Sequence, residues 1–306
     1  MAHREQVDAI DVTVCICTFR RSSVLAAMKS VARQELPPKT SLRILVVDND
    51  ALPSALPIIE SFRANTSVDI DYRHAPGRNI SVARNAALDE TTTPWLAFLD
   101  DDEYASPDWL AELIAARHGA HAVFGPCQAL YGDWTPAWIK VGDYHSNRIP
   151  DREGPIDTGY TSNVLIDMGF VRRAGLRFDL ALGRSGGEDT MFFHSMFREG
   201  GALKYAREAT VYEEVVASRS NLPWIARRRF RAGQVYAKTF HQLDRASYRR
   251  ASWTAPFKIA ACGVMSAATA FRPNRAMWWL MRGTFHIGIL TYAMGMSIYQ
   301  EYAGSA

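Results

Sequence analysis

The sequence predicts an α/β fold: an open, largely parallel sheet with helices on its faces, followed by a helical C-terminal extension. Two observations predict it. Short apolar runs rich in Val, Ile and Leu alternate with segments whose apolar residues recur at helical spacing. Each of the early apolar runs ends in a loop of Asp, Asn, Thr or Arg. Near-continuous apolar strands are typical of a sheet that is buried on both faces.

The first strand–helix–strand unit lies at the N-terminus. Residues 12–17 form an apolar, β-rich run, residues 18–21 form a loop, and apolar residues from 24 to 31 follow at helical spacing. A second apolar run, residues 42–47, stops at Asp48-Asn49-Asp50. A strand, a helix and a second strand in this order predict a parallel βαβ unit.

The same pattern continues as helix, strand, helix and strand over residues 53–63, 69–73, 81–89 and 95–99. In open α/β sheets, ligands bind at the carboxyl ends of the strands. Loops 18–21, 48–50 and 100–103 each follow a predicted strand, so we expect them to converge on one crevice.

The 306 residues suit one main domain with an appendage. We expect a main domain over residues 1–245, with a donor half at about 10–120 and a loop-rich acceptor half at about 121–245. Residues 246–306 form the extension. Residues 1–216 carry a net charge of −8 and residues 217–306 a net charge of +11. The acidic part suits a cation, and the basic part suits phosphates or an anionic membrane.

Four consecutive carboxylates, Asp100 to Glu103, follow the apolar run 95–99. Such charges repel one another unless a cation or hydrogen bonds compensate them. Mg²⁺ or Mn²⁺ accepts one or two protein carboxylates and completes its shell with water and phosphate oxygens. The run therefore predicts a divalent metal site for a nucleotide diphosphate, against the alternative of a solvated acidic turn.

Three further groups could contribute. Asp48 and Asp50 could accept hydrogen bonds from a base or ribose, or form an Asx turn. Arg84 begins a predicted helix and could face a diphosphate, or lie on the surface. Glu188 and Asp189 follow a glycine pair and could supply a catalytic base, or cap a helix.

Six stretches in order resemble glycosyltransferase family 2, over about residues 12–245. They read CICTFRR at 15–21, VVDNDALPSA at 46–55, NISVARNAALD at 79–89, FLDDDE at 98–103, TGYTSNVLI at 158–166 and LGRSGGEDTMFF at 182–193. Within the family the chain is similar to bacterial exopolysaccharide enzymes of the succinoglycan type. The resemblance implies the GT-A fold.

The resemblance also implies roles for individual residues. The nucleotide sugar would be bound by Thr18, Arg20, Asp48, Asp50, Arg84, Asn85, Asp100 and Asp101. Asp102 would be the main ligand of Mn²⁺ or Mg²⁺, with Asp100 beside it and nearer the ribose. Asp189, next to Glu188, would be the catalytic base of an inverting transfer from a UDP-sugar, with glucose the expected sugar, to a lipid-linked saccharide in exopolysaccharide synthesis.

Two departures from the family pattern matter. Tyr212 stands where a GT-A enzyme often supplies a metal-binding His, which leaves a third protein ligand open. The QxxRW signature of processive synthases is missing near residues 227–234. We therefore expect one sugar to be transferred per encounter.

The C-terminal part contains two uncharged stretches, residues 259–271 and 283–300. The first is too short to span a bilayer, and the second is borderline and contains His286. We expect an in-plane or re-entrant hairpin at the inner face of the cytoplasmic membrane, with arginines against anionic lipid. The alternatives are a transmembrane helix and a buried helical pair. The N-terminus lacks the apolar core of a secretory signal, which also favours the cytoplasmic side.

Other functions compete with this interpretation. A metal-dependent nucleotidyltransferase would also need a diphosphate site, but it typically carries a glycine-rich basic loop, and loop 18–21 has no glycine. A dinucleotide dehydrogenase lacks its GxGxxG here. Residues 222–250 could make a basic nucleic-acid-binding module, yet no reading motif accompanies them, so we expect no nucleic acid as a partner.

Overall fold

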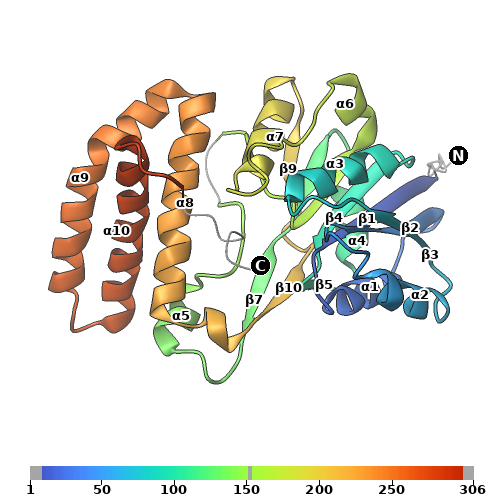
Figure 1. Cartoon of the computed structure of the whole chain (residues 1–306), viewed down its shortest axis with the longest axis horizontal. Helices are drawn as coiled ribbons and strands as arrows, with labels where there is room; N and C mark the ends of the chain where they lie inside the picture. Colours follow the sequence, from blue (N-terminus) through green and yellow to red (C-terminus); the bar gives the residue numbers. More distant parts are fainter. Residues whose placement is uncertain (1–8, 151–153, 299–306) are drawn as a thin grey trace, which may run out of the picture. The chain divides into compact units, whose positions relative to one another are not determined.

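The computed structural model describes residues 9–150 and 154–298 (Figure 1). The chain forms two compact units, and each is described by itself. The sheet unit comprises residues 1–128, 147–183 and 188–213. The helical unit comprises residues 129–146, 184–187 and 214–306.

The sheet unit contains a seven-stranded sheet in the order β3-β2-β1-β4-β8-β6-β9. Its strands are β1 (Ile10–Thr18), β2 (Thr40–Asp48), β3 (Asp69–His74), β4 (Trp95–Asp100), β6 (Ala122–Phe124), β8 (Asn163–Asp167) and β9 (Leu203–Tyr205). The first four strands in this order are parallel, β8 is antiparallel to both of its neighbours, and β6 and β9 are parallel. The predicted parallel α/β sheet is confirmed.

The strand register explains why the polar loops converge. Thr18 at the end of β1 pairs with Asp48 at the end of β2, and Cys17 pairs with Asp100 at the end of β4. Asp48 in turn pairs with His74 at the end of β3. The carboxyl ends of four strands therefore lie in one row, as predicted for a binding crevice of this sheet class.

Helices cover both faces of this sheet. One face packs against α1 (Val24–Ala32), α2 (Leu56–Arg63) and α4 (Trp109–Ala116); the other packs against α3 (Ile80–Glu90), α6 (Met168–Arg173) and α7 (Glu188–Arg198). Along β1, Val14 and Ile16 enter the first core and Cys15 enters the second. This alternation is the ordinary consequence of strand geometry, and it buries Cys15.

A second, three-stranded sheet has the order β5-β10-β7. It consists of β5 (Glu103–Ala105), β10 (Val211–Val215) and β7 (Cys127–Tyr131). In the antiparallel β5–β10 pair, Tyr212 faces Tyr104 with ring centroids 5.5 Å apart. β5 begins directly after the aspartate triplet, so pairing with β10 fixes the backbone on that side of Asp102.

The helical unit contains α5 (Ala137–Gly142), a 3-10 turn (Ala217–Arg219), α8 (Leu222–Leu243), α9 (Arg245–Ala268) and α10 (Pro273–Ala293). The three long helices pack side by side (Figure 1, orange to red). A Cβ on Gly233 would lie 1.9 Å from the carbonyl oxygen of Phe285, and one on Gly288 would lie 2.0 Å from that of Phe230. Only glycine permits this approach of α8 and α10.

Two features of the C-terminal part bear on its organisation. α8 packs along α9 and α10 and is grouped with them in one compact unit, whereas the boundary at 245/246 stays a prediction. The stretch 283–300 is not one helix, since α10 ends at Ala293, and residues 299–300 lie outside the described part of the chain. Within residues 9–150 and 154–298, we find no helix with the length and apolar character needed to cross a bilayer.

Candidate active site

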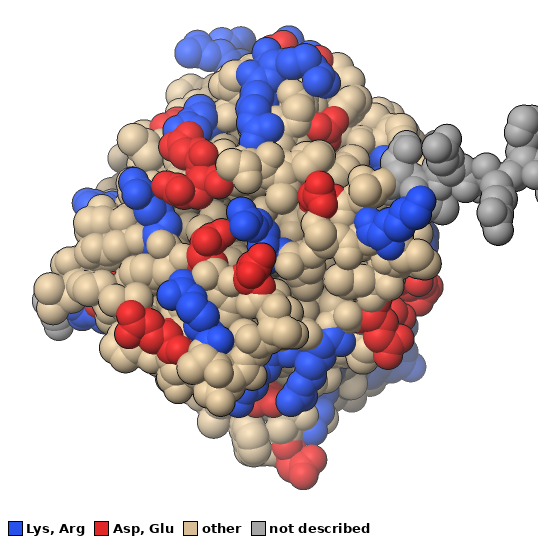
Figure 2. Space-filling view, turned by 90° about the vertical axis from the view of Figure 1, so that its right-hand side faces the viewer, with Lys and Arg blue, Asp and Glu red and all other residues tan. Residues whose placement is uncertain are grey.

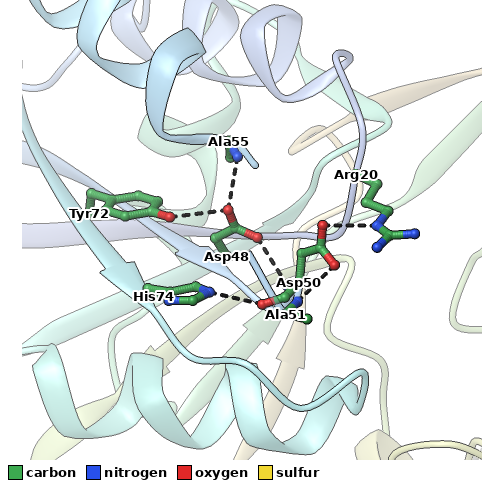
Figure 3. Close-up of polar contacts among 7 residues, drawn as sticks. All are labelled: Arg20, Asp48, Asp50, Ala51, Ala55, Tyr72 and His74. Atoms are coloured by element: carbon green, nitrogen blue, oxygen red, sulfur yellow. Dashed lines mark hydrogen bonds and ion pairs between the residues drawn. The ribbon is translucent and has the colours of Figure 1, made fainter. Parts of the chain in front are cut away.

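The loop after β2 is built around the carboxylate of Asp48, which is completely buried. Oδ1 accepts from the main-chain N–H of Asp50 (3.0 Å), and Oδ2 accepts from the N–H of Ala55 (2.8 Å) and the hydroxyl of Tyr72 (3.1 Å) (Figure 3). Asp48 therefore shapes the loop, as an Asx-type turn does. This geometry does not favour the expected contact between the Asp48 carboxylate and the base or ribose.

Arg20, in the loop after β1, is an exposed cation beside this loop. Its Nε donates to Oδ2 of Asp50 (2.8 Å), and nearly half of the arginine side chain remains exposed (47%). The hydrogen bond from Arg20 holds the pKa of the Asp50 carboxyl below its usual range. Arg20 has φ +55°, a left-handed conformation that a non-glycine residue adopts at some cost in free energy. The loops after β1 and β2 are thus joined by an ion pair that fixes the guanidinium of Arg20 beside Asp50 (Figure 3).

The aspartate triplet divides into a buried and an accessible part. Asp101 is buried, and it accepts from the hydroxyl of Thr18 (2.7 Å) and from Nη1 of Arg21 (2.8 Å). Arg21 also contacts Asp102 at 2.6 Å, and the side chain of Asp102 is 28% exposed. Asp101 and Thr18 therefore tie β1 to the loop, whereas Asp102 and Asp100 are the carboxylates that a ligand could reach.

Asp100 carries a strongly perturbed carboxyl group. Burial raises its pKa to about 7, Arg84 opposes the rise, and the neighbouring carboxylates of Asp102 and Asp101 add to it. A divalent cation would relieve this repulsion. Two hard oxygen donors, with further positions left for phosphate and water, match the needs of Mg²⁺ or Mn²⁺. The described residues contain no cluster of three or more His, Cys, Asp or Glu arranged to hold a metal.

Arg84 connects the triplet with the Glu188–Asp189 pair. It is 7% exposed, and its Nη1 lies 2.6 Å from Oε1 of Glu188, which is also buried. Although burial works against its charge, the carboxylates of Glu188, Asp100 and Asp189 raise the pKa of Arg84 further. The alternative of a surface arginine is therefore wrong. Arg84 is a buried cation with carboxylates of both acidic motifs around it.

Asp189 carries a carboxyl group whose pKa is raised. It lies in the first turn of α7, where its Oδ1 accepts from the N–H of Thr190 (2.6 Å). Burial raises the pKa of its carboxyl to about 6, the charge of Glu188 adds to the rise, and Arg84 opposes it. Asp189 is thus ionised at neutral pH yet more basic than an exposed aspartate. The other oxygen of Glu188, Oε2, is buried and has no hydrogen-bond partner among the described residues.

Asn85, an expected site residue, and Tyr212, which stands where a metal-binding His is often found, both make contacts within the protein. Both polar atoms of Asn85 bind the main chain of Phe178: Nδ2 donates to its oxygen (2.8 Å), and Oδ1 accepts from its N–H (2.9 Å). Asn85 therefore anchors the chain ahead of α7, and we no longer place it on the nucleotide. Tyr212, at the position where a metal-binding His was considered, packs its ring on Tyr104.

Sequence reasoning missed Arg21 and Tyr72 as parts of the site. Arg21 follows Arg20 in the same loop, and a basic loop opposite three aspartates is a signal for such a pair. Tyr72 lies on β3, whose register with β2 could not be read from the sequence.

Comparisons with known proteins identify the family of this chain. Residues 13–177 match the model described as glycosyl transferase family 2. The chain is 39% identical over 303 residues to the succinoglycan biosynthesis protein ExoM of Rhizobium meliloti (strain 1021), and the match covers 96% of each protein.

Solved structures show the same fold at low sequence identity. The mannosyltransferase PcManGT from Pyrobaculum calidifontis, in complex with GDP-Man and Mn²⁺, has a TM-score of 0.64 at 16% identity, over 95% of this chain and 89% of that one. S. aureus TarS in complex with UDP-GlcNAc has a TM-score of 0.50 at 12% identity, over 95% and 93%. The family model and the relative of similar length together show that this chain belongs to glycosyl transferase family 2 and is a glycosyltransferase of the GT-A fold.

Proposed function

We propose that the enzyme transfers one sugar, with inversion, from a nucleotide sugar to a saccharide hydroxyl. One observation carries this proposal: the buried guanidinium of Arg84 is paired with Glu188 and lies within the electrostatic reach of both Asp100 and Asp189. The donor end and the basic carboxylate are thus parts of one charge network. An inverting transfer requires these two functions side by side.

In the proposed reaction, Asp189 takes the proton of the acceptor hydroxyl as that oxygen bonds to the anomeric carbon. The bond from the anomeric carbon to the diphosphate oxygen breaks, and its electron pair leaves with the nucleoside diphosphate. General-base assistance of this kind contributes about 10²–10⁴-fold to the rate. The raised pKa of Asp189 increases its proton affinity while leaving it ionised at neutral pH.

Arg20, Arg21 and Arg84 supply positive charge around the departing diphosphate. Arg84 is fixed by Glu188, so its charge requires little reorganisation during the reaction. Asp100 and Asp102 would hold Mn²⁺ or Mg²⁺, which supplies Lewis-acid stabilisation of the diphosphate when bound. The residues of the chain bind, orient and neutralise the donor.

Glu188 has a second part in this proposal. Its Oε1 is engaged by Arg84, whereas its Oε2 is buried without a partner in the described structure. A buried acceptor without a partner costs free energy, which a substrate hydroxyl would recover. We therefore assign Oε2 to a sugar hydroxyl and the proton transfer to Asp189.

The identities of donor and acceptor rest on relatives. The similarity to the succinoglycan protein ExoM supports a role in exopolysaccharide synthesis with a lipid-linked saccharide as acceptor. It also favours glucose from UDP-glucose, although PcManGT was solved with GDP-Man and TarS with UDP-GlcNAc. The base of the nucleotide is therefore the first property to measure.

A thermal-shift screen of UDP-, GDP- and dTDP-sugars, each with and without Mn²⁺, tests donor binding. Ligand at about 100 times its dissociation constant stabilises the fold by about 2.7 kcal/mol, so one nucleotide class should raise the melting temperature clearly. The shift should need Mn²⁺ and should be lost in Asp102→Ala. Asp108→Ala is the matched control, because Asp108 lies at the exposed start of α4. If no nucleotide shifts the wild-type protein, the proposed function falls.

A further inference from the structure

Helix α9 carries an exposed apolar stripe along one side. Trp253 is 79% exposed, Phe257 70%, Val264 67%, and Phe271 in the turn after the helix 76%. Steps of four and seven residues separate them, and such steps return to the same side of a helix. Four large apolar side chains in one row differ from the scattered single residues that are normal on a protein surface.

The opposite side of α9 is apolar as well. Ala255 and Cys262 are buried there, and Ala255 packs in a cluster with Ala237 of α8 and Ile289 of α10. The interior of the helical unit thus accounts for one side of α9 only. A helix that is apolar on both sides is normally covered on both.

The charges beside this stripe all have one sign. Residues 245–298 contain no Asp or Glu, and their Lys and Arg side chains are all exposed: Arg245, Arg249, Arg250, Lys258, Arg272, Arg275 and Arg282. Arg249 lies one turn before Trp253, and the guanidinium of Arg272 lies 5.3 Å from the ring centre of Phe271. By contrast, the face drawn in Figure 2 shows Lys and Arg interspersed with Asp and Glu.

We propose that this stripe of α9, defined by Trp253, Phe257, Val264 and Phe271, docks in the plane of an anionic phospholipid surface. The aromatic and aliphatic side chains enter the boundary between headgroups and acyl chains, and the flanking arginines pair with lipid phosphates. In the cell this surface would be the inner face of the cytoplasmic membrane.

Charge favours lipid over a second copy of the chain as the occupant. In a two-fold interface the same surface meets itself, so the arginines of one copy would face those of the other. Such like-charge contacts oppose association, whereas anionic headgroups neutralise them. This inference rests on the proposed function in one respect: docking would bring the enzyme to a lipid-linked acceptor at that surface.

The test is co-sedimentation of the full chain with vesicles of equal parts phosphatidylglycerol and phosphatidylcholine. Val264→Asp should weaken binding by about tenfold or more, because it places a charge in the docked stripe. Val141→Asp is the matched control: Val141 is also a helical valine with 67% exposure, on α5, and its variant should bind like wild type. The double variant Arg249→Ala, Arg250→Ala should weaken binding by about thirtyfold, which is about fivefold for each arginine.

Several outcomes would overturn this proposal. If the chain bound vesicles of phosphatidylcholine alone as tightly as the mixed vesicles, charge would have no role. If Val264→Asp and Val141→Asp weakened binding by the same factor, the stripe would have no role. If Val264→Asp instead turned a dimer into a monomer with vesicle binding unchanged, the stripe would be an interface between copies. Nucleotide-induced thermal shifts in the same variants separate the two proposals, because loss of docking leaves donor binding intact.

Discussion

The sheet unit and the helical unit use charged side chains in opposite ways. In the sheet unit the key charges are paired inside the protein: Arg84 and Glu188 form a buried pair, and the buried Asp101 is paired with the partly exposed Arg21. In the helical unit, the basic side chains of residues 245–298 are exposed beside exposed apolar residues. A buried ion pair fixes the positions of its side chains and shifts their pKa values. An exposed cation instead can contact a ligand or surface outside the protein. We propose that the first unit carries out the chemistry and that the second attaches the enzyme to a membrane.

Replacing a paired arginine in the sheet unit should produce the largest effect on stability. Arg84→Ala leaves Glu188 buried without its partner, and breaking a buried pair in this way costs about 3–5 kcal/mol. The midpoint of urea denaturation measures this loss. Arg275→Ala, at an exposed position of α10, should change stability by no more than about 0.5 kcal/mol. Similar costs for the two variants would abolish the distinction between the units.

The dependence of turnover on pH should separate the units as well. The pKa of Asp189 is raised to about 6, so its base form predominates above pH 6 and is lost as the pH falls. At saturating donor, kcat at pH 5 should be about tenfold below its plateau. Vesicle binding through arginines should change little over the same range, because they remain charged. A kcat that stays level down to pH 4 would exclude Asp189 as the titrating base.

A smaller effect should follow from the loop around Asp48. Tyr72→Phe removes the hydroxyl that donates to Oδ2 of Asp48, and loss of one such hydrogen bond costs about 1 kcal/mol. Thermal denaturation measures the change. Tyr248→Phe in the helical unit keeps the ring against His241 and Tyr292 and should cost less than about 0.5 kcal/mol. If the two costs are the same, the Asp48 network does not stabilise the loop.

The local elements could be predicted from the sequence because periodicity is a local property. The strands of the parallel part and the loops that follow them are as expected within a residue or two. The neighbours of α8 could not be predicted, because the basic run in α8 indicates a helix but not what it packs against. The close approach of Gly233 to Phe285 and of Gly288 to Phe230 is a tertiary contact that places α8 beside α10.

The sequence predicted which residues belong to the candidate site better than it predicted what each of them contacts. Arg84 and Glu188 were both singled out, yet they are 104 residues apart in the chain, and no local pattern pairs them. The resemblance implied a place for Asn85 on the nucleotide, whereas its amide binds the main chain of Phe178. Polar residues near a site can serve the ligand or the fold, and tertiary contacts decide which.

The central claim is that Asp189 provides the base for a donor bound by the aspartate triplet. The direct test compares kcat and nucleotide-induced thermal shift in wild type and Asp189→Asn. Turnover should fall by about 10²–10⁴-fold while the shift with nucleotide sugar and Mn²⁺ stays that of wild type. Near-normal turnover in Asp189→Asn would contradict the account.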